Sequence, residues 1–199
     1  MSDPLGPLLA QARACRICAD TLDPRPVLRL SAQSRVLIVG QAPGSRAHAS
    51  GVPWDDPSGD HLRAWLDVSR ADFDDPDRFG VLSMGLCYPG RGAGGDRPPP
   101  SVCAETWHPP LLAALPHVRL TLVIGQVAQA RVLGPRRKRT LTDTVRAWRD
   151  YGPTHVPLPH PSWRSRGWRS RNPWFDADVL PALRVAVRDA WADPGPTSR

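Results

Sequence analysis

Four short hydrophobic runs stand out along the chain and predict buried β-strands. They cover residues 35–40, 79–86, 120–125 and 155–158, and prolines weaken the pattern of the last run. Continuous apolar runs of this length are typical of strands that are buried on both faces of a parallel sheet.

Amphipathic segments with helical spacing separate these runs. In residues 58–68, Leu62, Trp65 and Leu66 fall on one face, and Ser58 is the expected N-cap. The other predicted helices cover residues 104–115, 126–133, 141–148 and 177–191, and Pro109 and Pro110 interrupt the first of these. This alternation predicts an α/β sandwich around a small parallel sheet. We expect one domain over residues 1–192 and a disordered tail at 193–199.

The predicted sheet points to three loops as the place of function. In open α/β sheets ligands bind beyond the carboxyl ends of the strands, which selects residues 41–59, 83–100 and 160–174. Residues 89–100, PGRGAGGDRPPP, are rich in glycine and proline, so we expect no regular structure there. Because cysteines flank this segment, we expect an ordered loop that they hold.

Length and charge narrow the class of protein. The 199 residues suit one domain, and no apolar run approaches the ~20 residues that span a bilayer. The N-terminus shows no signal-peptide pattern, so we expect a cytoplasmic monomer without a membrane partner. Lys+Arg outnumber Asp+Glu by 26 to 19, and Lys138 is the only lysine. An arginine-rich basic domain with eight tryptophans favours a nucleic-acid partner.

Four cysteines suggest a metal site. Cys15 and Cys18 form a C-x2-C pair, and Cys87 and Cys103 follow much later. Without a secretory signal a disulfide framework is disfavoured. Four thiolates can hold a [4Fe–4S] cluster or a tetrahedral zinc ion, and their chemistry alone leaves both open, beside the alternative of unrelated buried thiols.

Several short motifs together resemble a known family. Gly40-Gln-Ala-Pro-Gly44 follows the first predicted strand, Gly51-Val-Pro-Trp54 and Ser58-Gly59 come next, and His160-Pro-Ser162 follows the last strand. With the four cysteines, this order resembles the uracil-DNA glycosylase superfamily, especially its iron–sulfur families four and five, from about Cys15 to Pro181. The resemblance implies a three-layer α/β/α sandwich around a four-stranded parallel sheet. It also favours the [4Fe–4S] cluster over zinc.

The resemblance implies an activity and a set of site residues. It implies a monofunctional DNA glycosylase of base excision repair, which flips uracil or a related deaminated base into a pocket and hydrolyses its glycosidic bond. Trp54 would stack on the base, and backbone N–H groups of the loop with Gly40 and Ala42 would face it. Gln41 would hydrogen-bond the base or a water, and His160 would stabilise charge on the leaving base.

Two positions remain open in this assignment. Asp56, in the context Asp56-Pro-Ser-Gly59, is the first candidate for activating water and Asp55 the second; alternatively, both are solvated or cap the following helix. Ser83 stands where family four has an asparagine. A hydroxyl cannot make the paired contacts by which an amide reads uracil, so the preferred base is left open.

The segment after His160 is the predicted DNA contact. Trp163 and Trp168 alternate there with Arg164, Arg166, Arg169 and Arg171. Arginines can neutralise phosphates and tryptophan can wedge into the base stack; a solvated charged loop is the alternative. Residues 136–139 form a second basic cluster, which either contacts phosphates or is a solvated turn.

A second function class competes with the enzyme. Gln41, where family four has a glutamate, and Ser83 both depart from the pattern of that family, and they leave room for a catalytically weak or inactive DNA- or lesion-binding protein on the same iron–sulfur fold. A third possibility is a zinc or iron–sulfur protein of another function, because a fold does not fix a function. For an enzyme of chromosomal DNA we expect a place at the bacterial nucleoid.

Overall fold

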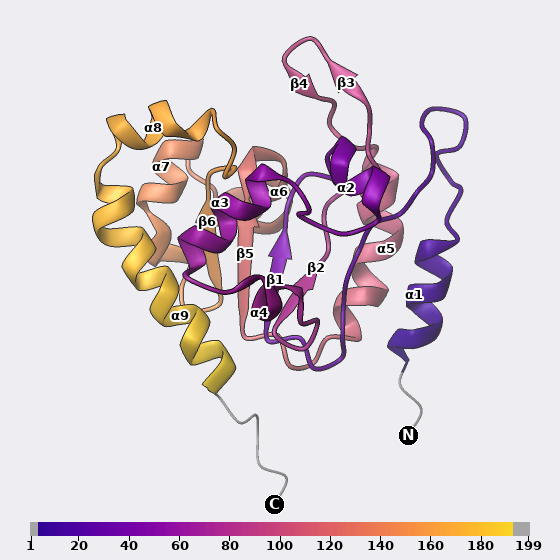
Figure 1. Ribbon diagram of the computed structural model, residues 1–199, viewed down its shortest axis with the longest axis horizontal. Helices are drawn as coiled ribbons and strands as arrows, with labels where there is room; N and C mark the ends of the chain where they lie inside the picture. Colours follow the sequence, from indigo (N-terminus) through magenta and orange to yellow (C-terminus); the bar gives the residue numbers. More distant parts are fainter. Residues whose placement is uncertain (1–3, 193–199) are drawn as a thin grey trace, which may run out of the picture.

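A four-stranded parallel sheet runs through the centre of the molecule in the computed structural model, which describes residues 4–192 (Figure 1). Its strands are β1 (Val36–Val39), β2 (Phe79–Val81), β5 (Leu120–Ile124) and β6 (His155–Leu158), in the order β2-β1-β5-β6. All pairings are parallel, and β1 lies between β2 and β5. The predicted four-stranded parallel sheet is confirmed.

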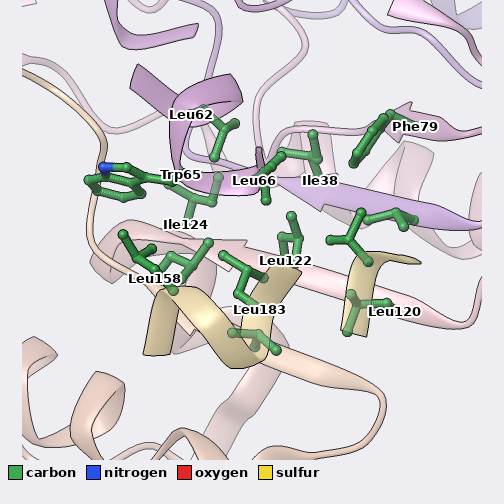
Figure 2. Close-up of a cluster of buried hydrophobic side chains, with 14 of the residues drawn as sticks. Ile38, Leu62, Trp65, Leu66, Phe79, Leu120, Leu122, Ile124, Leu158 and Leu183 are labelled. Atoms are coloured by element: carbon green, nitrogen blue, oxygen red, sulfur yellow. The ribbon is translucent and has the colours of Figure 1, made fainter. Parts of the chain in front are cut away.

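One face of the sheet is covered by α3 (Pro57–Leu66), α4 (Arg70–Asp74), α7 (Leu141–Arg146) and α9 (Leu180–Ala192). Figure 2 shows how Leu62, Trp65 and Leu66 of α3 and Leu183 of α9 meet side chains of the strands. Every second residue of β1 points to this side, so Val36 and Ile38 join this core.

The opposite face is covered by α1 (Leu5–Arg13), α5 (Ser101–Ala113) and α6 (Gly125–Leu133). Leu37 and Val39 of β1 point to this side, where Trp107 and Leu111 of α5 also pack. Helices on both faces make the fold a three-layer α/β/α sandwich, as predicted. They also explain why β1 is a continuous apolar run, because all four of its residues are buried.

The second strand is shorter than its apolar run predicted. After Val81 the strand ends, but the chain stays bonded to β1 and to the loop that follows it: Leu82 N–H donates to Ile38 O at 3.0 Å and Met84 N–H donates to Gly40 O at 2.9 Å. Leu82, Met84 and Leu86 are nevertheless buried, in the core beside α5. Their hydrophobicity therefore reflects packing of an irregular segment and not a longer strand.

Two predicted loops contain regular structure. Residues 89–100 include a short antiparallel hairpin, β3 (Arg91–Gly92) and β4 (Gly95–Asp96), so the expectation of no regular structure was wrong. Gly95, at φ 140°, adopts a backbone conformation that side-chain-bearing residues rarely take, which permits the tight turn. The loop after β6 likewise contains α8 (Ser165–Arg171).

Helix boundaries differ from the prediction at three places. Asp56, and not Ser58, is the N-cap of α3, because Pro57 fits the first helical position. Helix α5 begins at Ser101 and continues through both prolines to Ala113. A π-helical turn, Phe175–Val179, precedes α9. The shorter elements that complete the fold are α2 (Ser45–Ser50) and the 3₁₀ turns Gly134–Arg136 and Trp148–Tyr151.

Two further expectations concern membrane-spanning helices and the C-terminal tail. Within residues 4–192, no helix combines the length and the apolar character that crossing a bilayer requires. The predicted disordered tail at 193–199 lies outside the described residues.

Candidate active site

An inner pocket of about 130 Å³ opens at the carboxyl ends of the strands. This is well below the roughly 300–1,000 Å³ typical of pockets for drug-sized ligands, so it suits a small ring. Three separate loops meet here because parallel strands bring their carboxyl ends to one edge. The predicted residues Ala42, Trp54, Asp56, Ser83 and His160 all line it.

Trp54 forms one wall of the pocket in an unusual backbone conformation. Its φ is 59°, in the left-handed region that tryptophan rarely adopts. The indole stacks on the His160 ring, with centroids 5.7 Å apart and planes inclined by 29°. Gly40 lies beside the indole, since a Cβ there would be in ordinary van der Waals contact with Trp54 at 3.5 Å. The predicted stacking platform is thus in the pocket, and His160 lies against it.

Gly59 allows the Trp54 backbone to lie where it does. A Cβ added to Gly59 would collide with the Trp54 carbonyl oxygen. The same carbonyl lies 3.5 Å from Nη1 of Arg63, a buried side chain of α3. The Ser58-Gly59 motif therefore reflects close contact between helix α3 and the Trp54 backbone.

His160 borders the pocket, in surroundings that favour the neutral form of its imidazole. The ring is open to solvent through the cavities it lines, while the protein atoms around it remove enough water to lower its pKa. The carboxylates of Asp56 and Asp96 act in the opposite direction and raise the pKa, but by less. The next residue, Pro161, is tied to α3, because its carbonyl lies 3.0 Å from His61 Nδ1. Sequence reasoning missed His61.

The two candidate carboxylates separate clearly. Asp56 is half-buried, lines the pocket and uses Oδ1 to accept the Gly59 N–H at 2.9 Å as the cap of α3. Its Oδ2 lies near the Gly44 backbone, since a Cβ on Gly44 would be 3.6 Å from it. Asp55 instead pairs with Arg70 at 2.7 Å, and this hydrogen bond lowers the pKa of Asp55. Asp56 therefore combines the predicted pocket position with the capping role that was its alternative.

Gln41 is placed differently from the prediction. Its side-chain amide donates to Arg97 O at 2.9 Å, next to the β3–β4 hairpin, and Gln41 does not line the inner pocket. The amide thus holds the hairpin and does not face the space where a base would lie.

Ser83 contributes a hydroxyl to the inner pocket. The residue is 6% exposed, and its Oγ would be 3.7 Å from a Cβ on Gly40. Its carbonyl accepts a hydrogen bond from His108 Nε2 at 3.0 Å. Burial lowers the pKa of His108, which fits a neutral ring in this supporting role. Sequence reasoning missed His108 because α5 brings it to Ser83 from 25 residues away.

A wider outer cleft of about 580 Å³ adjoins the inner pocket. The hairpin side contributes Tyr88, Arg91 and Asp96, and the opposite side contributes Trp163 and Arg164. Asp96 lines both cavities and was not foreseen, although it is the one carboxylate of the segment 89–100.

Most of the predicted DNA contacts directly after His160 are exposed, whereas one arginine is held by a carboxylate. Trp163 is 69% exposed, and Arg164 lies over its ring while donating to Gly94 O at 3.3 Å. Arg166 and Arg171 are exposed, and neither pairs with a carboxylate among residues 4–192. Arg169, in contrast, is held by Asp176 through two hydrogen bonds of 2.9 Å.

Other predicted contacts lie elsewhere. Trp168 is turned inward, where its Nε1 donates to Thr142 Oγ1 at 2.9 Å and its ring packs on Trp174, so it is not placed to enter a base stack. The basic residues 136–139 line neither cavity, and Lys138 pairs with Asp150 at 2.8 Å.

The four cysteines line one narrow cavity together with several prolines. Cys15 and Cys18 follow α1, Cys87 follows β2, and Cys103 lies on α5. Burial raises the pKa of the Cys87 thiol to about 11, and the other three cysteines add to the effect. Among the described residues, no group of three or more His, Cys, Asp or Glu side chains is arranged to hold a metal ion.

Hydrogen-bond donors are nevertheless directed at three of these sulfurs. Trp107 Nε1 donates to Cys15 Sγ and Leu86 N–H donates to Cys103 Sγ, each at 3.3 Å. A backbone hydrogen bond from Arg25 lowers the pKa of Cys87 against the effect of burial. Donors of this kind stabilise thiolate over thiol.

A comparison with known families relates the chain to a family of DNA-repair enzymes. The family model described as "Uracil DNA glycosylase superfamily" matches residues 29–184, well over half of the chain. The matched segment contains every lining residue of the inner pocket except Val27, as well as Cys87 and Cys103, and begins after Cys15 and Cys18.

Replacing Gly59 by alanine should destabilise the protein. The added methyl group must displace the Trp54 carbonyl, so we expect the free energy of unfolding to fall by about 3 kcal/mol. Urea denaturation measures the change. Gly6→Ala is the matched control, because a Cβ on Gly6 in α1 meets nothing within 4 Å. Equal stability of the two variants would contradict the role of this contact.

Proposed function

The chain belongs to the uracil DNA glycosylase superfamily, and we propose that it is a monofunctional DNA glycosylase that hydrolytically excises a deaminated base. Membership of this superfamily makes DNA the expected partner and places the protein among the hydrolases of DNA repair. The observation that carries the proposal is the inner pocket, where Trp54, Asp56 and His160 from two loops surround space for one ring. A bacterial enzyme of this kind would work in the cytoplasm, at the nucleoid.

The two adjoining cavities fit a flipped nucleotide. The inner pocket takes the base, which stacks on aromatic Trp54. The outer cleft takes the sugar and phosphates, with Arg91 and Arg164 in its lining and exposed Trp163 at its edge.

The proposed reaction replaces the C1′–N bond by a C1′–O bond and transfers one proton from water to a carboxylate. The water oxygen bonds to C1′ of the deoxyribose as the C1′–N bond breaks, and the electron pair of that bond leaves with the base. One water proton passes to Oδ2 of Asp56, the carboxylate oxygen that does not cap α3. The neutral imidazole of His160 donates a hydrogen bond to the base oxygen on which negative charge develops.

Ser83 favours a second candidate, a lesion-binding protein with weak or no catalysis. A hydroxyl offers the base edge fewer simultaneous contacts than an amide would, and the Gln41 amide is engaged by the hairpin. Both observations concern base recognition, whereas the groups proposed for bond cleavage are in the pocket. We therefore rank the enzyme first, with the preferred base to be found by experiment.

Cys15, Cys18, Cys87 and Cys103 are proposed to hold a [4Fe–4S] cluster, and the superfamily includes iron–sulfur members. Their fit rests on four soft thiols around one apolar cavity and on the N–H donors aimed at the sulfurs. Four thiolates could also hold a tetrahedral zinc ion, and the side chains of residues 4–192 are not arranged in advance for a metal of either kind, so the content of iron, sulfide and zinc distinguishes the two. When bound, the cluster would supply a cross-link between the segments after α1 and β2 and helix α5.

The activity is tested with duplex and single-stranded oligonucleotides that carry uracil, hypoxanthine, xanthine or a mismatch. We expect base release from at least one of them, and a single-turnover rate ~10²–10³-fold lower for His160→Ala with little change in DNA binding. His117→Ala is the control, since His117 lines neither cavity. Binding without release from any substrate would establish the lesion-binding alternative.

Asp56→Asn and Asp56→Ala should separate chemistry from helix capping. Asparagine caps a helix about as well as aspartate but cannot take the water proton, so we expect a rate loss of ~10²–10⁴-fold with near-normal stability. Alanine should give the same rate loss and also destabilise by about 1 kcal/mol. A wild-type rate in Asp56→Asn would exclude Asp56 as the proton acceptor.

Cys87→Ser should impair cluster binding. Protein purified without oxygen should contain iron and acid-labile sulfide and absorb visible light, and the variant should lose much of both and melt at a lower temperature. Stoichiometric zinc without sulfide, or unchanged iron content and melting in the variant, would contradict the cluster.

The arginines after His160 should determine how DNA binding depends on salt. Each lost phosphate contact should flatten the slope of log K against log salt by ~0.9 on duplex DNA. We expect this for Arg164→Ala, Arg166→Ala and Arg171→Ala, and a smaller change for Arg169→Ala because Asp176 already holds that side chain. Exposed Arg188 on α9 provides the control substitution. Identical slopes in all variants would show that this segment does not contact DNA.

A further inference from the structure

The β3–β4 hairpin brings a carboxylate to the junction of the two cavities. In Figure 1 the hairpin stands at the carboxyl end of the sheet, above α2. The residues that line both the inner pocket and the outer cleft are Ala42, Ser58, Asp96 and His160. Asp96 is the only acidic residue among them, and its charge acts on His160.

This junction is where the reacting sugar must lie if the proposed function is correct. A flipped base occupies the inner pocket while its phosphates stay in the outer cleft, so the glycosidic bond spans the junction. The anomeric carbon C1′ would then face Asp96 and His160.

Contacts from separate parts of the chain hold the hairpin in place. Gln41 Nε2 donates to Arg97 O at 2.9 Å, and Arg164 Nη1 donates to Gly94 O at 3.3 Å. The Tyr88 hydroxyl donates to Asp96 Oδ1 at 3.3 Å. The first two bonds end on main-chain carbonyls, so the hairpin position does not depend on the charge of Asp96.

One oxygen of Asp96 is free for a ligand. Within the described residues, Oδ1 receives the Tyr88 hydroxyl and Oδ2 receives no hydrogen bond. Asp96 is also exposed, so an incoming nucleotide can reach it. A negative charge that borders a DNA cleft weakens phosphate binding, which makes its position costly unless it serves the reaction.

We propose that Asp96 is a further catalytic residue, whose carboxylate stabilises the positive charge that develops on the deoxyribose. When the C1′–N bond breaks, its electron pair leaves with the base and the sugar carries positive charge. A fixed carboxylate beside C1′ stabilises that transition state more than the neutral substrate. Asp56 accepts the water proton, so the two carboxylates have different tasks.

Asp96→Asn tests the proposal, which rests on the proposed function. We expect a single-turnover rate ~10²–10³-fold lower on whichever lesion the wild type excises. Affinity for the same DNA should stay equal or rise, because a negative charge is removed from the cleft. Asp178→Asn, an exposed position outside both cavities, is the charge-matched control and should keep the wild-type rate. Loss of affinity together with rate would indicate a collapsed hairpin and contradict the proposal.

A second measurement does not depend on turnover. The probes are oligonucleotides with a cationic pyrrolidine or a neutral tetrahydrofuran in place of the target nucleoside. The wild type should prefer the cation, and Asp96→Asn should lose at least about tenfold of that preference.

The outcomes separate the two claims. If the wild type excises a base and Asp96→Asn keeps both its rate and its preference for the cation, the role of Asp96 is wrong and the proposed function stands. If the wild type excises no base from any substrate, both are overturned.

Discussion

Burial of strand β1 on both faces is the constraint on which the rest of the structure depends. All four of its residues are buried, with alternate side chains in the two cores, so β1 can only lie inside the sheet with helices on either side. This central position brings the loop after β1 to the middle of the carboxyl edge. The loop after β2 is bonded to it through Gly40 O, and the loop after β6 meets it at the Trp54–His160 stack. The pocket is therefore a consequence of sheet order.

The features that the sequence predicts well are those determined by local pattern. The strands follow from apolar runs, and the strand ends select the three loops that form the pocket; the resemblance to a known family selects Trp54, Asp56, Ser83 and His160 within those loops. The features that it does not predict depend on which distant segments touch. Gln41 reaches the hairpin across 56 residues, and Trp168 reaches Thr142 across 26. No periodicity in either segment could show these partners, so their side-chain directions and the position of Asp96 emerge only in three dimensions.

Asp56 shows how one side chain can serve stability and chemistry together. A carboxylate has two oxygens, and capping α3 occupies only Oδ1. The cap also fixes the side chain against the pocket, so the free oxygen is held in position without a separate ordering cost. The same short segment holds Trp54 in its left-handed conformation, because Gly59 leaves space for the Trp54 carbonyl. The start of α3 thus positions two of the proposed site residues at once.

The electrostatics of the pocket depend on a balance at His160. Removal of water lowers its pKa, and the carboxylates of Asp56 and Asp96 oppose that effect without overcoming it. A bound nucleotide would displace more water and so favour the neutral ring further, while bringing its own phosphates to the basic outer cleft. Asp96 then places negative charge at the junction of the two cavities, where the sugar of the proposed substrate would lie, and His160 offers a hydrogen-bond donor at the same junction. These two groups match a bond that breaks with positive charge on the sugar and negative charge on the base. In the proposed mechanism, Asp56, Asp96 and His160 act on bond cleavage, whereas the identity of the base depends on Ser83 and the other walls of the inner pocket.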